Sequence, residues 1–236
     1  MALRPLLIIG AGGFGRETVE AVRAVNQARP TWDLIGFLDD GASHQGMVID
    51  GAPVVGPAAA LADHPDASVV ITIGNPDSFT VRRAIVRRLD LPAERYATIV
   101  HPAASIASSA HVGPGTVILA GTVATTAVTI GAHVVVMPAV VFTHDDVVDD
   151  YATFGSGVRL AGGVHIGVGA YIGAGALIRE RRTIGPWALV GMGAAVTRDV
   201  PAGEVWAGTP ARYFREVALP DDVRAELAIR AATVEQ

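Results

Sequence analysis

The sequence predicts a two-part α/β protein: a small Rossmann-like βαβ domain at the amino terminus, then a parallel β-helix of hexapeptide repeats. Three observations predict this fold class. Apolar residues recur at every sixth position between residues 106 and 196, without a change of phase. Small or β-branched residues fill the positions four places further on, with Asp146 and Arg182 as the exceptions. A glycine-rich turn at residues 10–15 separates an aliphatic run from a helical pattern.

The hexapeptide pattern indicates how the second part folds. Each unit supplies a short strand with one aliphatic residue pointing inward and a turn that small residues tolerate. One coil cannot bury its apolar face alone, so coils stack into a continuous aliphatic column. We expect this β-helix to span residues 99–212, after a first domain at residues 1–98. A tail at residues 213–236 has helical spacing.

Composition excludes several classes of protein. The 236 residues are 50% apolar and only 6% aromatic, with 27 glycines, which fits coils of small residues. The net charge of −5 offers no basic surface to nucleic acid, and no apolar run is long enough to span a membrane. Cysteine is absent, which excludes disulfides and thiolate metal sites. The apolar amino terminus runs into a glycine turn and not a cleavage site, so we expect a cytoplasmic protein.

The amino-terminal pattern indicates a phosphate-binding βα unit. Residues 6–9 form an aliphatic run typical of a buried strand, and residues 18–25 have helical apolar spacing. The glycines between them follow a G-x-G-x-x-G arrangement. Such a turn lets the backbone and the helix amino terminus approach an anion.

An acidic pair, Asp39 and Asp40, follows the second predicted strand at residues 33–38. In a dinucleotide fold an acidic residue at this place binds the ribose, so we expect a nucleotide-type ligand. A third strand at residues 68–73 and a basic helix at residues 79–89 complete the domain. That is about half of a full dinucleotide fold, which disfavours an NAD oxidoreductase.

His144 is the strongest candidate for a general base. Without cysteine, the seven histidines are the natural candidates, and His111 and His133 fall on the polar side of their hexads. His144 differs because its hexad lacks glycine and Asp145 and Asp146 follow it directly. A carboxylate beside an imidazole orients the ring and raises its basicity. Taken alone, the same letters also fit a surface histidine in an acidic turn.

The chain resembles a known family over nearly its whole length. Residues 99–212 resemble the left-handed β-helix acyltransferases of the hexapeptide-repeat family. The GAGGFG start, the LDD at 38–40, the IGN at 73–75 and the exit motif WAGTPAR at 206–212 extend this resemblance to the sugar O- and N-acetyltransferases of bacterial polysaccharide biosynthesis. The resemblance implies an acetyl-CoA-dependent acyltransferase.

The resemblance implies a nucleotide-sugar site in the first domain. Six residues would bind this substrate: Gly12, Gly13 and Phe14 at the phosphates, Asp39 and Asp40 near the uracil or ribose, and Gly74 closing the pocket. The acceptor implied is the amino group of a nucleotide-linked amino sugar. O-acetylation of sialic acid or another sugar is the alternative.

The resemblance also implies the catalytic pair and the donor site. His144 would be the general base, with Asp145 in place of the glutamate that is frequent in the family. Four residues would bind acetyl-CoA: Thr153, Gly162, Ala174 and Met192. Of these, Gly162 lies one coil of eighteen residues after the base and would offer its backbone N–H to the thioester carbonyl. Thr153 replaces a second histidine that often contacts the acyl donor.

The same resemblance implies the partners of the protein, and two rival functions must be weighed against it. The family's members are homotrimers whose donor site lies between adjacent subunits, and acetyl-CoA is a co-substrate, with no permanently bound cofactor. A non-catalytic nucleotide-sugar binder is one rival. A zinc enzyme on the same coil fold is another, but zinc needs three converging histidines. His144 and His165 occupy different hexad positions, so we expect no metal.

Overall fold

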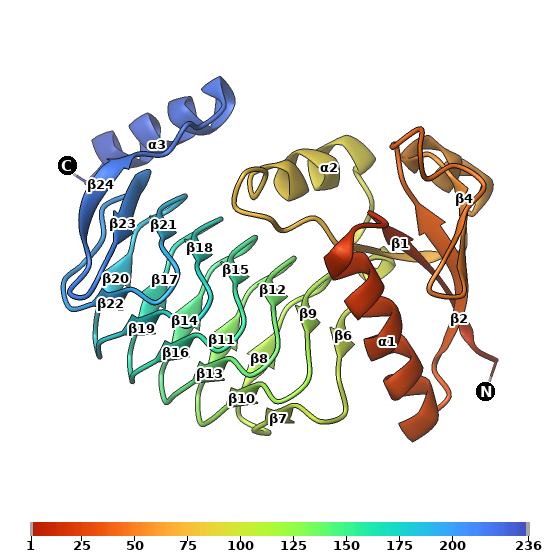
Figure 1. Ribbon diagram of the computed structural model, residues 1–236, viewed down its shortest axis with the longest axis horizontal. Coiled ribbons are helices and arrows are strands. Elements are labelled where there is room, and N and C mark those ends of the chain that lie inside the picture. Colours follow the sequence, from red (N-terminus) through yellow and green to blue (C-terminus); the bar gives the residue numbers. More distant parts are fainter. Residues whose placement is uncertain (1, 235–236) are drawn as a thin grey trace.

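The computed structural model describes residues 2–234, in which an α/β domain lies against one face of a long β-helix (Figure 1). Residue 1 and residues 235–236, the end of the expected tail, lie outside the described residues. The predicted fold class, an α/β domain followed by coils of short parallel strands, is confirmed.

The first domain is a small sheet covered on both faces by helices. Its strand order is β3-β4-β2-β1-β5, and only β3 is antiparallel to its neighbour. The strands are β1 (Arg4–Ile9), β2 (Trp32–Leu38), β3 (Val48–Ile49), β4 (Ala52–Gly56) and β5 (Ser68–Ile71). The helices are α1 (Gly13–Ala28) and α2 (Val81–Leu89), with short 3₁₀ helices at Ala58–Asp63 and Ala93–Arg95.

Strand β1 shows why both sheet faces are covered. Leu6 and Ile8 pack into the cluster that includes Val19 of α1. The alternate residues Leu7 and Ile9 pack on the opposite face, into a cluster that includes Ile85 of α2. Since successive side chains of a strand point to opposite faces, a continuous aliphatic run requires a cover on each side.

The β-helix has three faces of parallel two-residue strands, stacked one coil every 18 residues. Face 1 contains β6 (Ile99–Val100), β9 (Val117–Ile118), β12 (Val135–Val136), β15 (Thr153–Phe154), β18 (Tyr171–Ile172) and β21 (Leu189–Val190). Face 2 contains β7 (Ser105–Ile106), β10 (Val123–Ala124), β13 (Val141–Phe142), β16 (Arg159–Leu160), β19 (Leu177–Ile178) and β22 (Ala195–Val196). Face 3 contains β8 (His111–Val112), β11 (Thr129–Ile130), β14 (Val147–Val148), β17 (His165–Ile166) and β20 (Thr183–Ile184).

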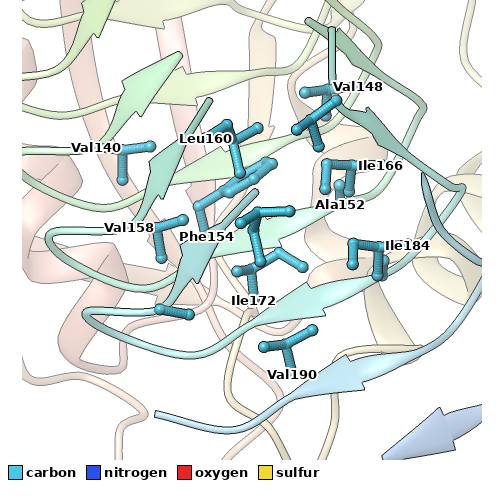
Figure 2. Packing of buried hydrophobic residues seen from close by; sticks show 14 of the residues in the cluster. Val140, Val148, Ala152, Phe154, Val158, Leu160, Ile166, Ile172, Ile184 and Val190 are labelled. Atoms are coloured by element: carbon cyan, nitrogen blue, oxygen red, sulfur yellow. The ribbon is translucent and has the colours of Figure 1, made fainter. Parts of the chain in front are cut away.

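The second residue of these strands is the predicted inward position. Figure 2 shows Phe154, Leu160, Ile166 and Ile172 gathered in the interior, where each is 0–1% exposed. The small residues of the second column also point inward and join the same cluster, as Val158 does. The hexapeptide period therefore corresponds to one side of a triangular coil, and three hexads make one turn.

Three turns join the faces of each coil, so the β-helix has three corners. The 1–2 corner follows face 1 and contains Met137, whereas the 2–3 corner follows face 2 and contains His144. The 3–1 corner follows face 3 and contains His133 and Tyr151.

The carboxyl end of the chain covers the last coils. Strand β23 (Glu204–Ala207) continues face 1, and β24 (Arg212–Glu216) pairs with it antiparallel. Helix α3 (Asp221–Val234) then turns back, so the expected helical tail begins with a strand. In Figure 1, α2 and α3 lie on the same side of the coils. Arg83 of α2 pairs with Asp222 (3.2 Å) and Glu226 of α3.

The first domain also buries a histidine that the sequence placed on the polar side of its hexad. His133 is 5% exposed, stacked on Tyr151 with ring centroids 5.3 Å apart and edge-on to Tyr96 at 4.5 Å. Burial, together with the charge of Arg82, lowers the pKa of His133 to about 4. The expectation was wrong because the domain covers the 3–1 corner, and His133 is a neutral packing residue.

Arg82 of α2 joins the domain to the coils. It is 1% exposed and donates hydrogen bonds to the carbonyl oxygens of Ile73 (2.6 Å) and His133 (2.7 Å). It also donates to the carbonyl oxygen of Tyr151 and to Thr153 Oγ1 (2.9 Å), one coil further on. One buried guanidinium thus satisfies acceptors in the α/β domain and in two successive coils.

Replacing Arg82 by Met should destabilise the protein by roughly 2–4 kcal/mol, because several buried acceptors would lose their donor. The free energy of unfolding in urea would measure this. Arg87, on the same helix, is 63% exposed and pairs with Asp222 at 3.7 Å. Arg87→Met should therefore change stability by less than about 0.5 kcal/mol. Equal effects of the two substitutions would contradict the role of Arg82.

Candidate active site and nucleotide pocket

A cavity of about 420 Å³ opens where the carboxyl ends of β1 and β5 meet the 1–2 corner of the β-helix. Five of the six residues expected to bind the nucleotide sugar line it: Gly12, Gly13, Phe14, Asp39 and Gly74. Its other lining residues are Gly10, His44, Thr72, Ile73, Asn75 and Met137. Met137 comes from the β-helix, so both parts of the chain form this pocket.

The glycine turn leaves the pocket floor free of side chains. A methyl group added at Gly12 or Gly13 would meet no atom within 4 Å, so backbone is exposed there to a ligand. Gly15 has a different role, because a side chain at that position would collide with the carbonyl oxygen of Gly10. Helix α1 begins at Gly13, and the free N–H groups of its first turn would face an anion placed on this floor.

Asp39 anchors the turn more than it offers a free carboxylate. Its two oxygens accept the backbone N–H groups of Ala11 (2.7 Å) and Gly41 (2.8 Å). His44 Nδ1 lies 3.0 Å from the second of these oxygens. Burial acts to raise the pKa of Asp39, but these donors outweigh it and hold the pKa below its usual value. Asp39 thereby positions His44 at the rim of the pocket.

Asp40 lies beside a neighbouring hollow of about 210 Å³, whose walls include Ile9, Leu38 and Ile85. Its Oδ1 accepts the backbone N–H of Ala58 (2.8 Å), and its Oδ2 lies 3.8 Å from Arg88 Nη2. Asp39 lines both hollows, whereas Asp40 lines the second and not the first. His44 and Arg88 were not among the predicted site residues. His44 lies beside Asp39 and Arg88 beside Asp40, and sequence spacing does not reveal either contact.

His144 and Asp145 form a pair on the 2–3 corner. His144 Nδ1 lies 2.8 Å from Asp145 Oδ2, and both side chains are largely exposed. Asp145 has φ +64°, a left-handed conformation that turns its carboxylate back beside the ring. When neutral His144 donates from Nδ1 to this carboxylate, Nε2 has a free lone pair. The arrangement is that of an oriented general base.

The imidazole lies over Gly162 of the next coil. A methyl group added at Gly162 would come within 3.0 Å of three ring atoms of His144, among them Nε2. The neighbouring N–H of Gly163 donates to the carbonyl oxygen of His144 (2.9 Å). Among the hydrogen bonds of the described residues, the N–H of Gly162 has no acceptor. This N–H is available to donate to a substrate oxygen placed beside His144 Nε2.

The other residues expected at the acetyl-CoA site lie elsewhere. Ala174 and Met192 follow β18 and β21 and therefore belong to the 1–2 corner, on the same side as the nucleotide pocket. Thr153 is 1% exposed under α2, and its hydroxyl accepts a hydrogen bond from Arg82. The expected contact between Thr153 and the acyl donor is not supported by this position, because the α/β domain covers it.

Among the described residues, no group of three histidine, aspartate or glutamate side chains is placed to hold a metal ion. Over the same part of the chain, no helix is both long and apolar enough to cross a membrane.

Comparison with known proteins gives consistent matches. Residues 5–89 match the family described as PglD N-terminal domain. A UDP-N-acetylbacillosamine N-acetyltransferase of Bacillus subtilis is 32% identical over 124 residues, which are 50% of this chain and 52% of that protein. The chain thus spans about half the length of this curated relative.

Two solved structures match nearly end to end. The acetyltransferase domain of PglB from Neisseria gonorrhoeae, in complex with acetyl coenzyme A, superposes with a TM-score of 0.80 at 30% identity and covers 90% of this chain and 100% of its own. PerB from Caulobacter crescentus, in complex with CoA and GDP-perosamine, gives a TM-score of 0.79 at 27% identity, over 90% and 98% of the two chains.

Proposed function

Because this chain belongs to the left-handed β-helix sugar acetyltransferases of the hexapeptide-repeat family, we propose that it transfers an acetyl group from acetyl-CoA to the amino group of a nucleotide-linked amino sugar. The observation that carries this proposal is the oriented His144–Asp145 pair, whose free Nε2 lies over the unpaired N–H of Gly162. The Bacillus subtilis relative is named as a UDP-N-acetylbacillosamine N-acetyltransferase, and the Caulobacter crescentus structure is a complex with CoA and GDP-perosamine.

The geometry supports the following steps. The sugar amine attacks the thioester carbonyl carbon while His144 Nε2 accepts a proton from the amine. Asp145 holds the opposite nitrogen and stabilises the imidazolium that forms. The N–H of Gly162 donates to the carbonyl oxygen as negative charge develops on it. The tetrahedral intermediate then collapses, the C–S bond breaks, and the coenzyme A thiolate leaves and takes up the proton from His144.

The two hollows of the first domain suit the two ends of a nucleotide. The pocket floor of Gly12 and Gly13 would cradle the diphosphate at the amino terminus of α1, with the imidazole of His44 beside it. The adjoining hollow, with Asp40 and Arg88 at its rim, would take the base or ribose. Lining residues Phe14 and Met137 then lie at the sugar end, which faces the coils.

Release of free coenzyme A thiol tests the proposal directly. Purified protein would be given acetyl-CoA and amino sugars linked to UDP, GDP or dTDP, each beside the analogue in which a hydroxyl replaces the amine. Thiol release that depends on an amino sugar supports N-acetylation, whereas release with the hydroxyl analogues supports the O-acetyl alternative. No release above background with any acceptor would refute an acetyltransferase.

We propose further that the working form is a homotrimer with its sites between subunits. Within one chain the nucleotide pocket, Ala174 and Met192 belong to the 1–2 corner, while His144 and Gly162 belong to the 2–3 corner. The two groups thus lie at opposite ends of face 2. In a cyclic trimer, the 1–2 corner of one chain can face the 2–3 corner of its neighbour, which unites acceptor and base.

Mixed trimers would test this arrangement. Gly12→Asp places a good helix N-cap at the start of α1 but puts a negative charge where the diphosphate would bind. Trimers of Gly12→Asp alone, or of His144→Ala alone, should be inactive. Co-expression of the two should restore activity to about a quarter of the sites, since neighbours can combine an intact pocket with an intact base. Mixed trimers without activity would place the whole site within one chain.

A further inference from the structure

Asp146 interrupts the column of small residues and carries a charge into the interior of the coil. Its neighbours in the same column at the 2–3 corner are Val128, one coil before, and Val164, one coil after. The side chain of Asp146 is nevertheless fully buried, at 0% exposure. Burial of a carboxylate is costly unless its oxygens are hydrogen-bonded. The contacts of Asp146 therefore indicate what it is for.

Each oxygen of Asp146 accepts one backbone N–H, and the two donors lie in different coils. Oδ2 accepts the N–H of Thr143 at 2.8 Å, which closes the turn that contains His144 and Asp145. Oδ1 accepts the N–H of Val164 at 2.9 Å, at the end of the turn that begins with Gly162. One carboxylate therefore connects the turn of the candidate base to the turn of the candidate oxyanion donor.

We propose that Asp146 is a positioning residue, which fixes the imidazole of His144 and the N–H of Gly162 at the spacing that acetyl transfer requires. This inference rests on the function proposed above. Asp146 does not contact substrate, because its side chain is enclosed by the coil. Its effect on the reaction passes through the two turns that it joins.

The protonation state of Asp146 gives this role a measurable signature. Burial raises the pKa of Asp146 to about 6, although the N–H groups of Val164 and Thr143 and the charge of His144 act to lower it. Asp145 is the other charged group that acts on it, and it raises the pKa. Above pH 6 the ionised carboxylate accepts both N–H groups. Below pH 6 the added proton opposes one of these donors, and the link between the turns weakens.

The protonation of Asp146 affects folding stability and activity in opposite directions, which separates a positioning role from a stabilising one. A carboxyl group whose pKa is raised by folding stabilises the fold most below its unfolded pKa, and this contribution is lost as pH rises through about 6. The fold is therefore less stable with Asp146 ionised, as it is at neutral pH when the carboxylate joins the two turns, than with Asp146 protonated. Asp146→Asn, which resembles the protonated acid, should keep the melting temperature of the wild type at pH 7.5 or exceed it, while lowering activity.

The test compares Asp146→Asn and Asp146→Ala with Thr116→Val. Thr116 is also fully buried, and its hydroxyl accepts the N–H of Val134, likewise one coil later, at 3.0 Å. It lies at the 3–1 corner, away from His144, so its substitution removes a similar coil-to-coil bond without affecting the site. We expect both Asp146 variants to lose roughly 10- to 100-fold in kcat, since a small misplacement of reacting groups has effects of this size. KM for both substrates should stay within about threefold, and Thr116→Val should keep kcat.

The pH profile provides a second readout. In the wild type, the acid limb of kcat should include a loss of activity through about pH 6, where protonation of Asp146 weakens the link between the two turns. In Asp146→Asn this part of the acid limb should be absent, because the amide does not titrate. Asp146 variants with kcat within twofold of the wild type would overturn the inference, as would a loss of kcat that follows a loss of melting temperature. A wild-type protein that releases no thiol would overturn the proposed function and this inference together.

Discussion

Replacing His144 by Ala should lower kcat for thiol release by about 10²- to 10⁴-fold, the range in which a positioned general base acts. The amine must lose a proton as it attacks, and without Nε2 only water could accept that proton. KM for acetyl-CoA should change little, since His144 acts on the acceptor. The corner turn should keep its shape because His144 is exposed and binds the coil through its backbone, by the N–H of Gly163.

His165 provides the matched control for this substitution. It too is an exposed histidine beside a carboxylate, with Nε2 3.2 Å from Asp149 Oδ1, but it lies on face 3. His165→Ala should keep kcat within about twofold of the wild type, as expected for a surface residue outside the site. If both variants lose activity equally, or if His144→Ala stays active, His144 is not the base. Measurement of particle mass would check that each variant assembles like the wild type.

The coils could be predicted from the sequence because their contacts repeat at a fixed short spacing. Each inward residue, such as Phe154, contacts equivalents one coil away, so the same choice of side chain recurs at every sixth position. The candidate catalytic corner stands out in the sequence for the same reason, since His144 and Asp146 interrupt the regular hexapeptide pattern on either side of them. The glycine turn was predictable because strand, turn and helix are adjacent in sequence.

The contacts between the two parts of the chain could not be predicted in this way. Arg82 satisfies carbonyl groups about 50 and 70 residues further on, and no repeat or motif connects these positions. The sequence alone gives no sign of this contact. It therefore places Thr153 at a position expected to bind the acyl donor and His133 on the polar side of its hexad. Asp39 lines the candidate pocket, but its use as an anchor for Ala11 and His44 depends on the folded turn.

Replacing Gly162 by Ala should lower kcat by about 10²- to 10³-fold, comparable to the loss of one oxyanion donor. Gly162 has no positive φ, so alanine fits its backbone, but the added methyl group must displace the imidazole of His144. The imidazole would then move away from the N–H of Gly162, so the base and the oxyanion donor would no longer act on the same reacting group. The effect should fall on kcat with little change in the free energy of unfolding.

Gly157→Ala should give the reverse result, and this contrast makes the prediction specific to the site. Gly157 has φ +72°, where a side chain is strained, yet the added methyl group would meet no atom within 4 Å. We expect a loss of about 1 kcal/mol in stability and a much smaller loss of kcat than in Gly162→Ala, because the methyl group at Gly157 is far from the imidazole of His144. Urea unfolding and thiol-release kinetics on both variants would separate the two effects. General strain of the coil would instead make Gly162→Ala lose stability and activity together. That outcome would contradict a specific role for the close approach of His144 to Gly162.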